Sequence, residues 1–170
     1  MNGSPLRVRL AGPADADGIA AVHIQSWRET YSGLIPDRFM DAEALEMRRR
    51  MWASILAREP PPGVIAVAVR GRRVVGFAFA GASDHPDATK GIPAARPLHL
   101  YSIYLLADEH GTGTGSALLQ EVLGDRPAQL WVVSTNHRAC AFYERHGFSI
   151  DDATLDDPHL DGVVEVRMVR

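Results

Sequence analysis

Hydrophobic positions along the chain follow two periods, which predict strands that alternate with helices. Leu6–Leu10 alternates apolar and basic residues, as a half-buried strand does. A helix is predicted to follow Pro13-Ala14, with Asp15 as its N-cap candidate. Its inward positions recur at helical spacing: Ile19, Val22, His23, Trp27 and Tyr31.

Downstream patterns predict the remaining elements. A second helix is expected from about Pro36 to Ala57, with Leu45, Trp52, Ile55 and Leu56 as its inner stripe. Strands Val64–Val69 and Val74–Ala80 come next, joined by a hairpin turn at Gly71-Arg72-Arg73, and a loop follows from Ala82 to Pro97. Strand Leu98–Leu106 then leads to helix Gly113–Val122, whose inward residues are Leu118, Leu119 and Val122. The last elements are strand Leu130–Val133, helix Arg138–Arg145 with Ala139, Phe142 and Tyr143 inward, and strand Val163–Val169.

This order predicts an α/β fold with a mixed sheet of six to seven strands and about four flanking helices. The early strands can pair as an antiparallel meander, and the later strand–helix–strand unit should form a parallel, right-handed crossover. At about 150 residues per domain, the length of 170 residues predicts a single domain, residues 1–170.

Composition narrows the class of protein. The net charge of −3 gives no general electrostatic reason to bind nucleic acid or an anionic membrane. No apolar run approaches the roughly 20 residues needed to span a bilayer. The single cysteine, Cys140, cannot form an internal disulfide, and the histidines show no metal-ligand spacing. We therefore expect a cytoplasmic protein without a metal, without a nucleic-acid partner and without membrane attachment.

The most informative segment is a glycine-rich turn between a strand and a helix. Gly111, Gly113 and Gly115 occupy alternate positions, so backbone N–H groups are exposed at the positive end of a helix dipole. This arrangement favours a phosphate or pyrophosphate ligand over a connection that binds nothing. A Walker loop would need lysine where Ser116 stands, and the spacing also departs from the dinucleotide pattern G-x-G-x-x-G.

Two blocks resemble the GNAT superfamily of N-acetyltransferases. The run His110-Gly111-Thr112-Gly113-Thr114-Gly115 is similar to the family motif Q/R-x-x-G-x-G/A, with His110 at the first place. The run from Asn136 to Phe148 resembles the pattern N-x-x-A-x-x-F-Y-x-x-x-G-F. The order of elements is similar along nearly the whole chain.

The resemblance implies that acetyl-coenzyme A binds in a V-shaped gap between the fourth and fifth strands. The pyrophosphate would lie on the loop amides, the pantetheine arm would pair with the backbone near Tyr104, and Asn136 would contact the arm. Asp108 and Glu109 are expected to leave the loop less positive than is usual in the family. The implied cofactor-binding residues are Tyr104, Leu105, His110, Gly111, Thr112, Gly113, Thr114, Gly115, Ser116 and Asn136.

Acetyl transfer to an amine needs a route for the amine proton, a donor to the oxyanion, such as the Leu105 N–H, and a proton for the leaving thiolate. Tyr143 matches the family position for the last role, although an aromatic residue there would also fit a core. His99 falls where one branch of the family carries a base. A hydrogen-bonding role for His99 is as well supported, and many family members use ordered water.

His23, Trp27 and Tyr31 lie at i, i+4 and i+8, one above another on a helix that flanks the acceptor pocket in this family. With Tyr101 they are the candidate substrate-binding residues, and core packing is the alternative. The run Arg48-Arg49-Arg50 is interpreted as one solvated helix face.

The resulting hypothesis is an acetyl-CoA-dependent N-acetyltransferase that modifies a primary amine of a small molecule, such as a polyamine or an antibiotic-like amine. One alternative is an acetyltransferase for protein N-termini or lysines. Another is an acyl-CoA-binding regulatory module with little turnover, and a nucleotide-binding module ranks third. Family members are often dimers, so a homodimer is expected. The terminal strand Val163–Val169 would either pair across that interface or lie inside the sheet.

Overall fold

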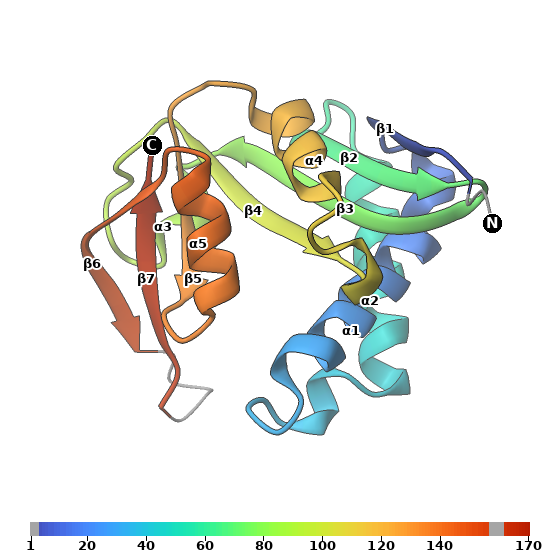
Figure 1. The fold of residues 1–170 in the computed structure, drawn as a ribbon, viewed down its shortest axis with the longest axis horizontal. Coiled ribbons are helices and arrows are strands. Elements are labelled where there is room, and N and C mark those ends of the chain that lie inside the picture. The colour runs from blue at the N-terminus through green and yellow to red at the C-terminus, as the bar shows by residue number, and fades with distance from the viewer. Residues whose placement is uncertain (1–3, 157–161) are drawn as a thin grey trace. The chain divides into compact units, whose positions relative to one another are not determined.

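A computed structural model describes residues 4–156 and 162–170, which form an α/β fold with a seven-stranded mixed sheet (Figure 1). The hydrogen-bonded strand order is β1-β2-β3-β4-β5-β7-β6. The strands are β1 Leu6–Leu10, β2 Gly63–Arg70, β3 Arg73–Ala82, β4 Leu98–Leu105, β5 Ala128–Val133, β6 Ser149–Asp156 and β7 Val164–Val169. The helices are α1 Ala16–Tyr31, α2 Ala42–Leu56, α3 Pro86–Thr89, α4 Thr114–Leu123 and α5 His137–Arg145, with 3₁₀ turns η1 Pro13–Asp15, η2 Asp37–Phe39 and η3 Ala107–Glu109.

The chain divides into two compact units. The first comprises Met1–Ala80 and Ser102–Gly124, and the second comprises Gly81–Tyr101 and Asp125–Arg170. The assignment of residues 1–170 to a single domain stays a prediction.

In the first unit, helices cover both faces of the strands: α1 and α2 lie on one face and α4 on the other (Figure 1). Strand β1 pairs antiparallel with β2, as expected for the start of a meander. The predicted inner face of α4 is confirmed, since Leu118, Leu119 and Val122 are at most 1% exposed. Burying side chains of this size stabilises the fold by about 1.5–3 kcal/mol each.

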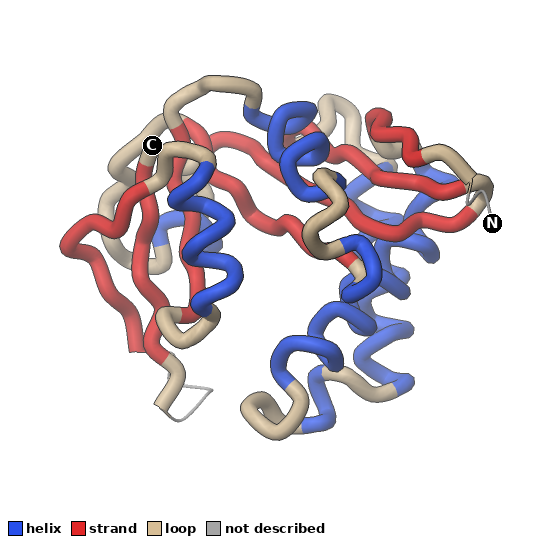
Figure 2. The backbone as a smooth tube through the Cα atoms, viewed as in Figure 1, coloured by secondary structure: helices blue, strands red, loops and turns tan. Residues whose placement is uncertain are grey.

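In the second unit, β4 and β5 pair in parallel at Leu98↔Ala128 and His99↔Gln129, which confirms the parallel arrangement expected of the strand–helix–strand unit. Strand β7 lies between β5 and β6 and is antiparallel to both, so the terminal strand is an interior one. Figure 2 shows that the segment between β3 and β4 is mostly loop, although the short helix α3 interrupts it.

Strand β6 was not predicted as a separate element. Its sequence, SIDDATLD, carries three aspartates and little apolar surface, because it is an edge strand that pairs only with β7 along the described chain. Charged side chains on an edge strand discourage pairing with other chains, which explains why hydrophobic periodicity does not reveal it.

Two helix starts differ from the predictions. Helix α2 begins at Ala42, not near Pro36, because the Asp41 side chain caps it by accepting from the Ala44 N–H at 2.8 Å. Asp15 does occupy the N-cap position of α1, but its carboxylate pairs with Arg9 at 2.7 and 2.8 Å and makes no cap hydrogen bond to α1.

The inner stripes of two helices were also predicted too broadly. On α2, Trp52 is buried, whereas Leu45, Ile55 and Leu56 are half-buried. On α5, only Tyr143 of the three predicted inward residues is buried, while Ala139 and Phe142 are half-buried.

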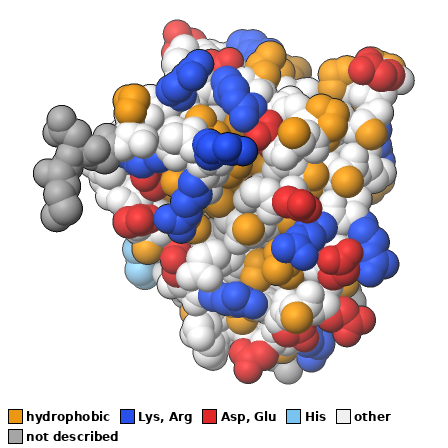
Figure 3. Space-filling model, turned by 90° about the vertical axis from the view of Figure 1, so that its right-hand side faces the viewer, with side chains coloured by type: hydrophobic (Ala, Val, Ile, Leu, Met, Phe, Trp, Pro, Cys, Tyr) orange, Lys and Arg blue, Asp and Glu red, His pale blue; other side chains and the backbone are white. Residues whose placement is uncertain are grey.

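The face of the molecule in Figure 3 carries acidic and basic side chains interspersed with apolar ones. The large apolar side chains that are most exposed come from four separate segments: Leu10, Leu34, Met47 and Ile150. Scattered exposed residues of this kind are normal on protein surfaces and indicate no particular partner. None of the described helices is long and apolar enough to cross a membrane.

Candidate functional site

The glycine-rich loop connects β4 to α4 in the first unit. Gly111 and Gly113 have φ angles of +77° and +89°, which side-chain-bearing residues rarely adopt, and Gly113 is the N-cap of α4. No described atom lies within 4 Å of where a Cβ would stand at either position, so space beside both glycines is open. Gly115, in contrast, is part of α4. The loop thus presents backbone at a helix N-terminus, as an anion-binding turn does.

One buried carboxylate organises this loop. Glu109, 4% exposed, accepts two hydrogen bonds from Arg70 of β2, at 2.6 and 3.0 Å. Its Oε2 also accepts from the hydroxyls of Thr114 at 2.8 Å and Thr112 at 3.2 Å. Hydrogen bonding from Arg70 is the main reason that the pKa of Glu109 lies below its usual value. The loop conformation is therefore tied to β2 by a single side chain.

This ion pair changes the expected charge of the loop. Glu109 was expected to make the loop less positive, but Arg70 compensates its charge and the carboxylate is used to hold the loop. Asp108 stays exposed. The neighbouring Ala107 N–H donates to Glu29 of α1 at 2.9 Å, which fixes the start of the turn.

An aromatic cluster surrounds His23 in the same unit. The His23 ring stacks on Tyr104 of β4, with centroids 5.0 Å apart and planes 23° apart, and meets Trp27 edge-on at 5.6 Å. Trp27 in turn contacts Tyr31 at 5.9 Å. The structure thus brings together His23, Trp27 and Tyr31, as helical spacing predicted, and adds Tyr104, which was assigned to the cofactor through its backbone.

His23 is held in its neutral form. The Trp52 Nε1–H donates to His23 Nδ1 at 3.3 Å, so the proton of the neutral ring is on Nε2. Burial, and secondarily the charge of Arg48, lower the pKa of His23 to about 3. His23 is therefore a poor proton acceptor near neutral pH and can serve a ligand only as a donor or an apolar surface.

His99 occupies a buried polar cluster in the second unit. It is 3% exposed, its Nδ1 lies 3.5 Å from Gln129 Nε2, and its ring meets that of Tyr101 edge-on at 4.7 Å. Burial, then the charge of Lys90, lower its pKa to about 4. Tyr101 donates its hydroxyl to the Ala82 carbonyl at 2.5 Å, and burial is the main cause that raises its pKa.

Asn136 and Tyr143 also lie in the second unit, on α5. Asn136 caps this helix, since its Oδ1 accepts from the Ala139 N–H at 3.2 Å. Tyr143 is buried between the rings of Phe142, at 5.4 Å, and Phe148, at 5.9 Å. The neighbouring Cys140 is half-buried, and burial raises its pKa, as for a packed thiol. The roles predicted for Asn136 and Tyr143 stay predictions.

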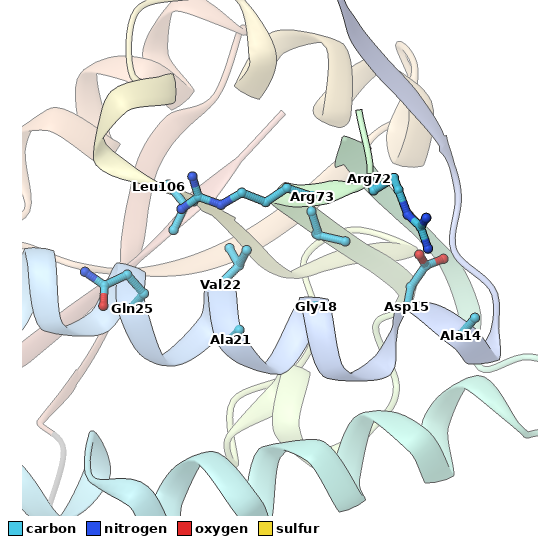
Figure 4. Close-up of a pocket in the computed structure, with 10 residues that line it drawn as sticks. Ala14, Asp15, Gly18, Ala21, Val22, Gln25, Arg72, Arg73 and Leu106 are labelled. Carbon is cyan, nitrogen blue, oxygen red and sulfur yellow. The ribbon is translucent and has the colours of Figure 1, made fainter. Parts of the chain in front are cut away.

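A pocket of about 380 Å³ in the first unit lies apart from these residues. It lies between α1 and the β2–β3 hairpin, and Figure 4 shows Arg73 extending toward Leu106 and Arg72 toward Asp15. None of the residues predicted for the cofactor, the acceptor or catalysis lines it. Elsewhere, no cluster of three or more His, Cys, Asp or Glu side chains within the described ranges is placed to hold a metal ion.

Three residues that shape these sites are not marked as site residues by the sequence patterns. Glu109 stands next to the glycine motif but lacks a sequence pattern that would pair it with Arg70, 39 positions away. Gln129 is a lone polar residue in an apolar strand, which is a sign of a buried hydrogen bond. Arg48 is four positions from each of Ala44 and Trp52, which are both buried, so helical spacing places it on the same inward face of α2.

Comparison with known proteins identifies the family. A model of the acetyltransferase (GNAT) family matches residues 24–148. The chain is 30% identical to the uncharacterized N-acetyltransferase YuaI of Bacillus subtilis, over 92% of this chain and 86% of that protein. It is 31% identical to the uncharacterized N-acetyltransferase Rv2669 of Mycobacterium tuberculosis, over 90% of this chain and 97% of that protein.

Among solved structures, the fold is similar to that of the N-acetyltransferase PaiA of Thermoplasma acidophilum in complex with coenzyme A. The TM-score is 0.73, with 18% identity and 98% of each chain covered. The family match covers more than half of the chain and includes both sequence blocks. This chain therefore belongs to the GNAT family of acetyltransferases.

Proposed function

We propose that this acetyltransferase uses acetyl-CoA and acetylates a primary amine of a small molecule, with polyamines and antibiotic-like amines as the first classes to test. The glycine-rich loop carries the proposal. Its two left-handed glycines and the open space beside them fit a group that approaches the backbone closely, such as a pyrophosphate. The Glu109–Arg70 pair supports it further, because the loop is held in shape from within the protein.

In the proposed reaction, bound acetyl-CoA supplies an acetyl group activated as a thioester. Transfer forms a C–N bond, breaks the C–S bond, takes one proton from the amine and returns one to the sulfur. In the first unit, the amides of residues 111–115 would hold the pyrophosphate, the backbone near Tyr104 would pair with the pantetheine arm, and the Leu105 N–H would stabilise the carbonyl oxygen as charge develops there. The resemblance to the family assigns Asn136 of the second unit to the pantetheine arm and the Tyr143 hydroxyl to protonation of the sulfur.

The activity is tested by thiol release from acetyl-CoA with a panel of amines. Release that depends on the amine, together with an acetylated amine in the mass spectrum, supports the proposal. Binding of acetyl-CoA without amine-dependent release would favour a regulatory module instead. A calorimetric titration in which ATP or NAD binds and acetyl-CoA does not would favour a nucleotide-binding module.

Tyr143→Phe is expected to lower kcat on the order of 10²-fold, because it removes the acid for the departing thiolate. Affinity for acetyl-CoA should stay unchanged, as measured by calorimetry. Phe142→Leu is the matched control, since it changes the neighbouring ring without touching a hydroxyl. A near-normal kcat in Tyr143→Phe would show that Tyr143 does not protonate the thiolate and serves only in packing.

The proposed role of His99 as the base can be tested by pH. A base must be neutral to accept the amine proton, so the acid limb of kcat/KM is expected near the His99 pKa of about 4, well below the ordinary value near 6.5. His99→Gln should lower the rate and remove that limb. If the acid limb of the kcat/KM profile persists in His99→Gln, then water or another group accepts the amine proton.

A further inference from the structure

Arg48 differs from the two arginines that follow it on α2. Arg49 lies 3.7 Å from Asp17 and 3.5 Å from Glu46, and Arg50 lies 3.5 Å from Glu46. Arg48 is half-buried and has no carboxylate partner anywhere in residues 4–156 and 162–170. The interpretation of the three arginines as one solvated face is therefore wrong for Arg48, which follows the buried register of the helix.

The surroundings of Arg48 are aromatic and neutral. Its guanidinium stands over the Trp27 ring, 5.5 Å from the centroid, and its Nη1 lies 3.8 Å from the Met51 sulfur. Burial lowers the pKa of Arg48, and the same positive charge contributes to lowering the pKa of His23. A guanidinium stays charged in proteins, so this site has the cost of desolvating a cation without the gain from a counter-ion.

A second donor in the same cluster also lacks a partner. The Nε1–H of Trp27 is buried, and no acceptor for it occurs among the described residues. Buried polar groups are nearly always hydrogen-bonded, and an indole N–H can only donate. Two side chains in direct contact thus lack a strong acceptor: the Arg48 guanidinium donates only to the Met51 sulfur and faces no carboxylate, and the Trp27 N–H has no acceptor among the described residues. The neighbouring His23 has its ring proton on Nε2.

We propose that Arg48 and Trp27 bind an anionic oxygen group of the acceptor, so that the substrate is an amine that also carries a carboxylate. The planar guanidinium matches a carboxylate with two parallel hydrogen bonds, and the rings of His23, Trp27 and Tyr104 accommodate the apolar part between the two ends. A polyamine would instead bring a second positive charge toward Arg48. This inference rests on the proposed amine acetylation and narrows its substrate class.

The test compares amines that differ only in the charge of the far end. Suitable probes are 5-aminopentanoate, its carboxamide 5-aminopentanamide, and 1,5-diaminopentane, assayed by thiol release at saturating acetyl-CoA. A phosphonate of the same length, 4-aminobutylphosphonate, distinguishes a carboxylate site from a more general anion site. We expect the carboxylate to have the highest kcat/KM and the diamine the lowest.

Variants then assign the preference to Arg48. Arg48→Gln should lower kcat/KM for 5-aminopentanoate by about 10- to 100-fold, the effect of losing a charge-assisted hydrogen bond, and change the carboxamide less than 3-fold. Arg48→Lys, which keeps the charge but not the planar fork, should fall between the two. Arg49→Gln is the matched control one position along α2 and should change neither substrate.

The outcomes separate this inference from the proposed function. Equal use of the carboxylate and the carboxamide by the wild type, or an equal loss for both in Arg48→Gln, overturns the role of Arg48 and leaves amine acetylation standing. If no amine is acetylated, thermal shift with 5-acetamidopentanoate decides the anion site by itself. Stabilisation of the wild type and Arg49→Gln, but not of folded Arg48→Gln, supports it, and no stabilisation of the wild type overturns it.

Discussion

In each of the two units a buried polar side chain anchors a loop, and the two anchors differ in charge. In the first unit, the carboxylate of Glu109 holds the glycine-rich loop through Arg70 and two threonine hydroxyls. In the second, the amide of Gln129 holds the long loop before β4, since its Oε1 accepts from the N–H groups of Ala95 at 2.6 Å and Arg96 at 3.2 Å.

The difference shows how the surroundings select the anchor. Gln129 is fully buried and faces backbone amides, which a neutral acceptor satisfies without the cost of a buried charge. Glu109 faces a cation that is partly exposed, so the charge is compensated and remains near solvent. The second loop is also held by Trp131, whose Nε1–H donates to the Ala88 carbonyl at 2.8 Å. A charged anchor suits the loop proposed to bind an anion, because its shape can be fixed without adding net charge.

The largest expected effect is the loss of stability when Gln129, the neutral anchor, is replaced. Gln129→Leu should destabilise the protein by about 2–5 kcal/mol, because it leaves two backbone N–H groups without their acceptor. Urea denaturation measures the loss. Gln25→Leu is the control, since Gln25 binds Glu29 on the outside of α1 and its replacement should stay within about 0.5 kcal/mol. A Gln129→Leu variant as stable as the wild type would mean that the loop is held by other contacts.

The next effect separates backbone strain from ligand binding. Gly113→Val and Gly91→Val each force a branched side chain into a left-handed position, with φ of +89° and +83°, and each has open space around it. Both should lose a similar amount of stability. Only Gly113→Val should lose acetyl-CoA affinity, on the order of 100-fold by calorimetry, since the residue borders the proposed pyrophosphate site. Equal affinities of the two variants for acetyl-CoA would show that the cofactor does not bind at the glycine-rich loop.

The smallest expected effect is the loss of stability when Glu109 is replaced, and its dependence on pH distinguishes this anchor from Gln129. Glu109→Gln should cost about 1–3 kcal/mol at pH 7, and a double-mutant cycle with Arg70→Gln should show coupling between the two residues. The folded-state pKa of Glu109 is lowered from its usual 4.5, so its contribution is present above pH 4.5 and is lost as pH falls through the lowered value. The stability difference between wild type and Glu109→Gln should therefore shrink in acid.

The corresponding difference for Gln129→Leu should stay constant over the same range, because Gln129 does not titrate. Stability curves at several pH values between 3 and 7 test both anchors in one series. A pH-independent difference for Glu109→Gln would contradict the assignment of a charged anchor to the glycine-rich loop.

Local patterns in the sequence were sufficient for the class of fold and the position of the glycine-rich turn. Apolar spacing correctly places the inner face of α4, because that helix packs on one face of the strands of the first unit and its buried residues follow the helical period. The glycines at positions 111 and 113 permit the left-handed φ angles that the structure shows there, because they lack a Cβ. Edge strand β6 was not predicted, because an exposed strand can be polar and its sequence then lacks the apolar alternation that indicates a strand.

Long-range pairing decided the rest, because no local pattern specifies which distant side chain meets which. Arg70 and Glu109 are 39 positions apart, and Trp52 reaches His23 across 29 positions to set its tautomer. Burial lowers the pKa of His99, and its Nδ1 lies 3.5 Å from the side-chain amide of Gln129, 30 positions away. Arg48 looks like its neighbours in the sequence, and only the packing of α2 against α1 places its charge beside Trp27 and away from the carboxylates that pair with Arg49 and Arg50. The sequence therefore determined which backbone could hold a cofactor, while the tertiary structure decided which charges are compensated, since that depends on distance and burial in three dimensions.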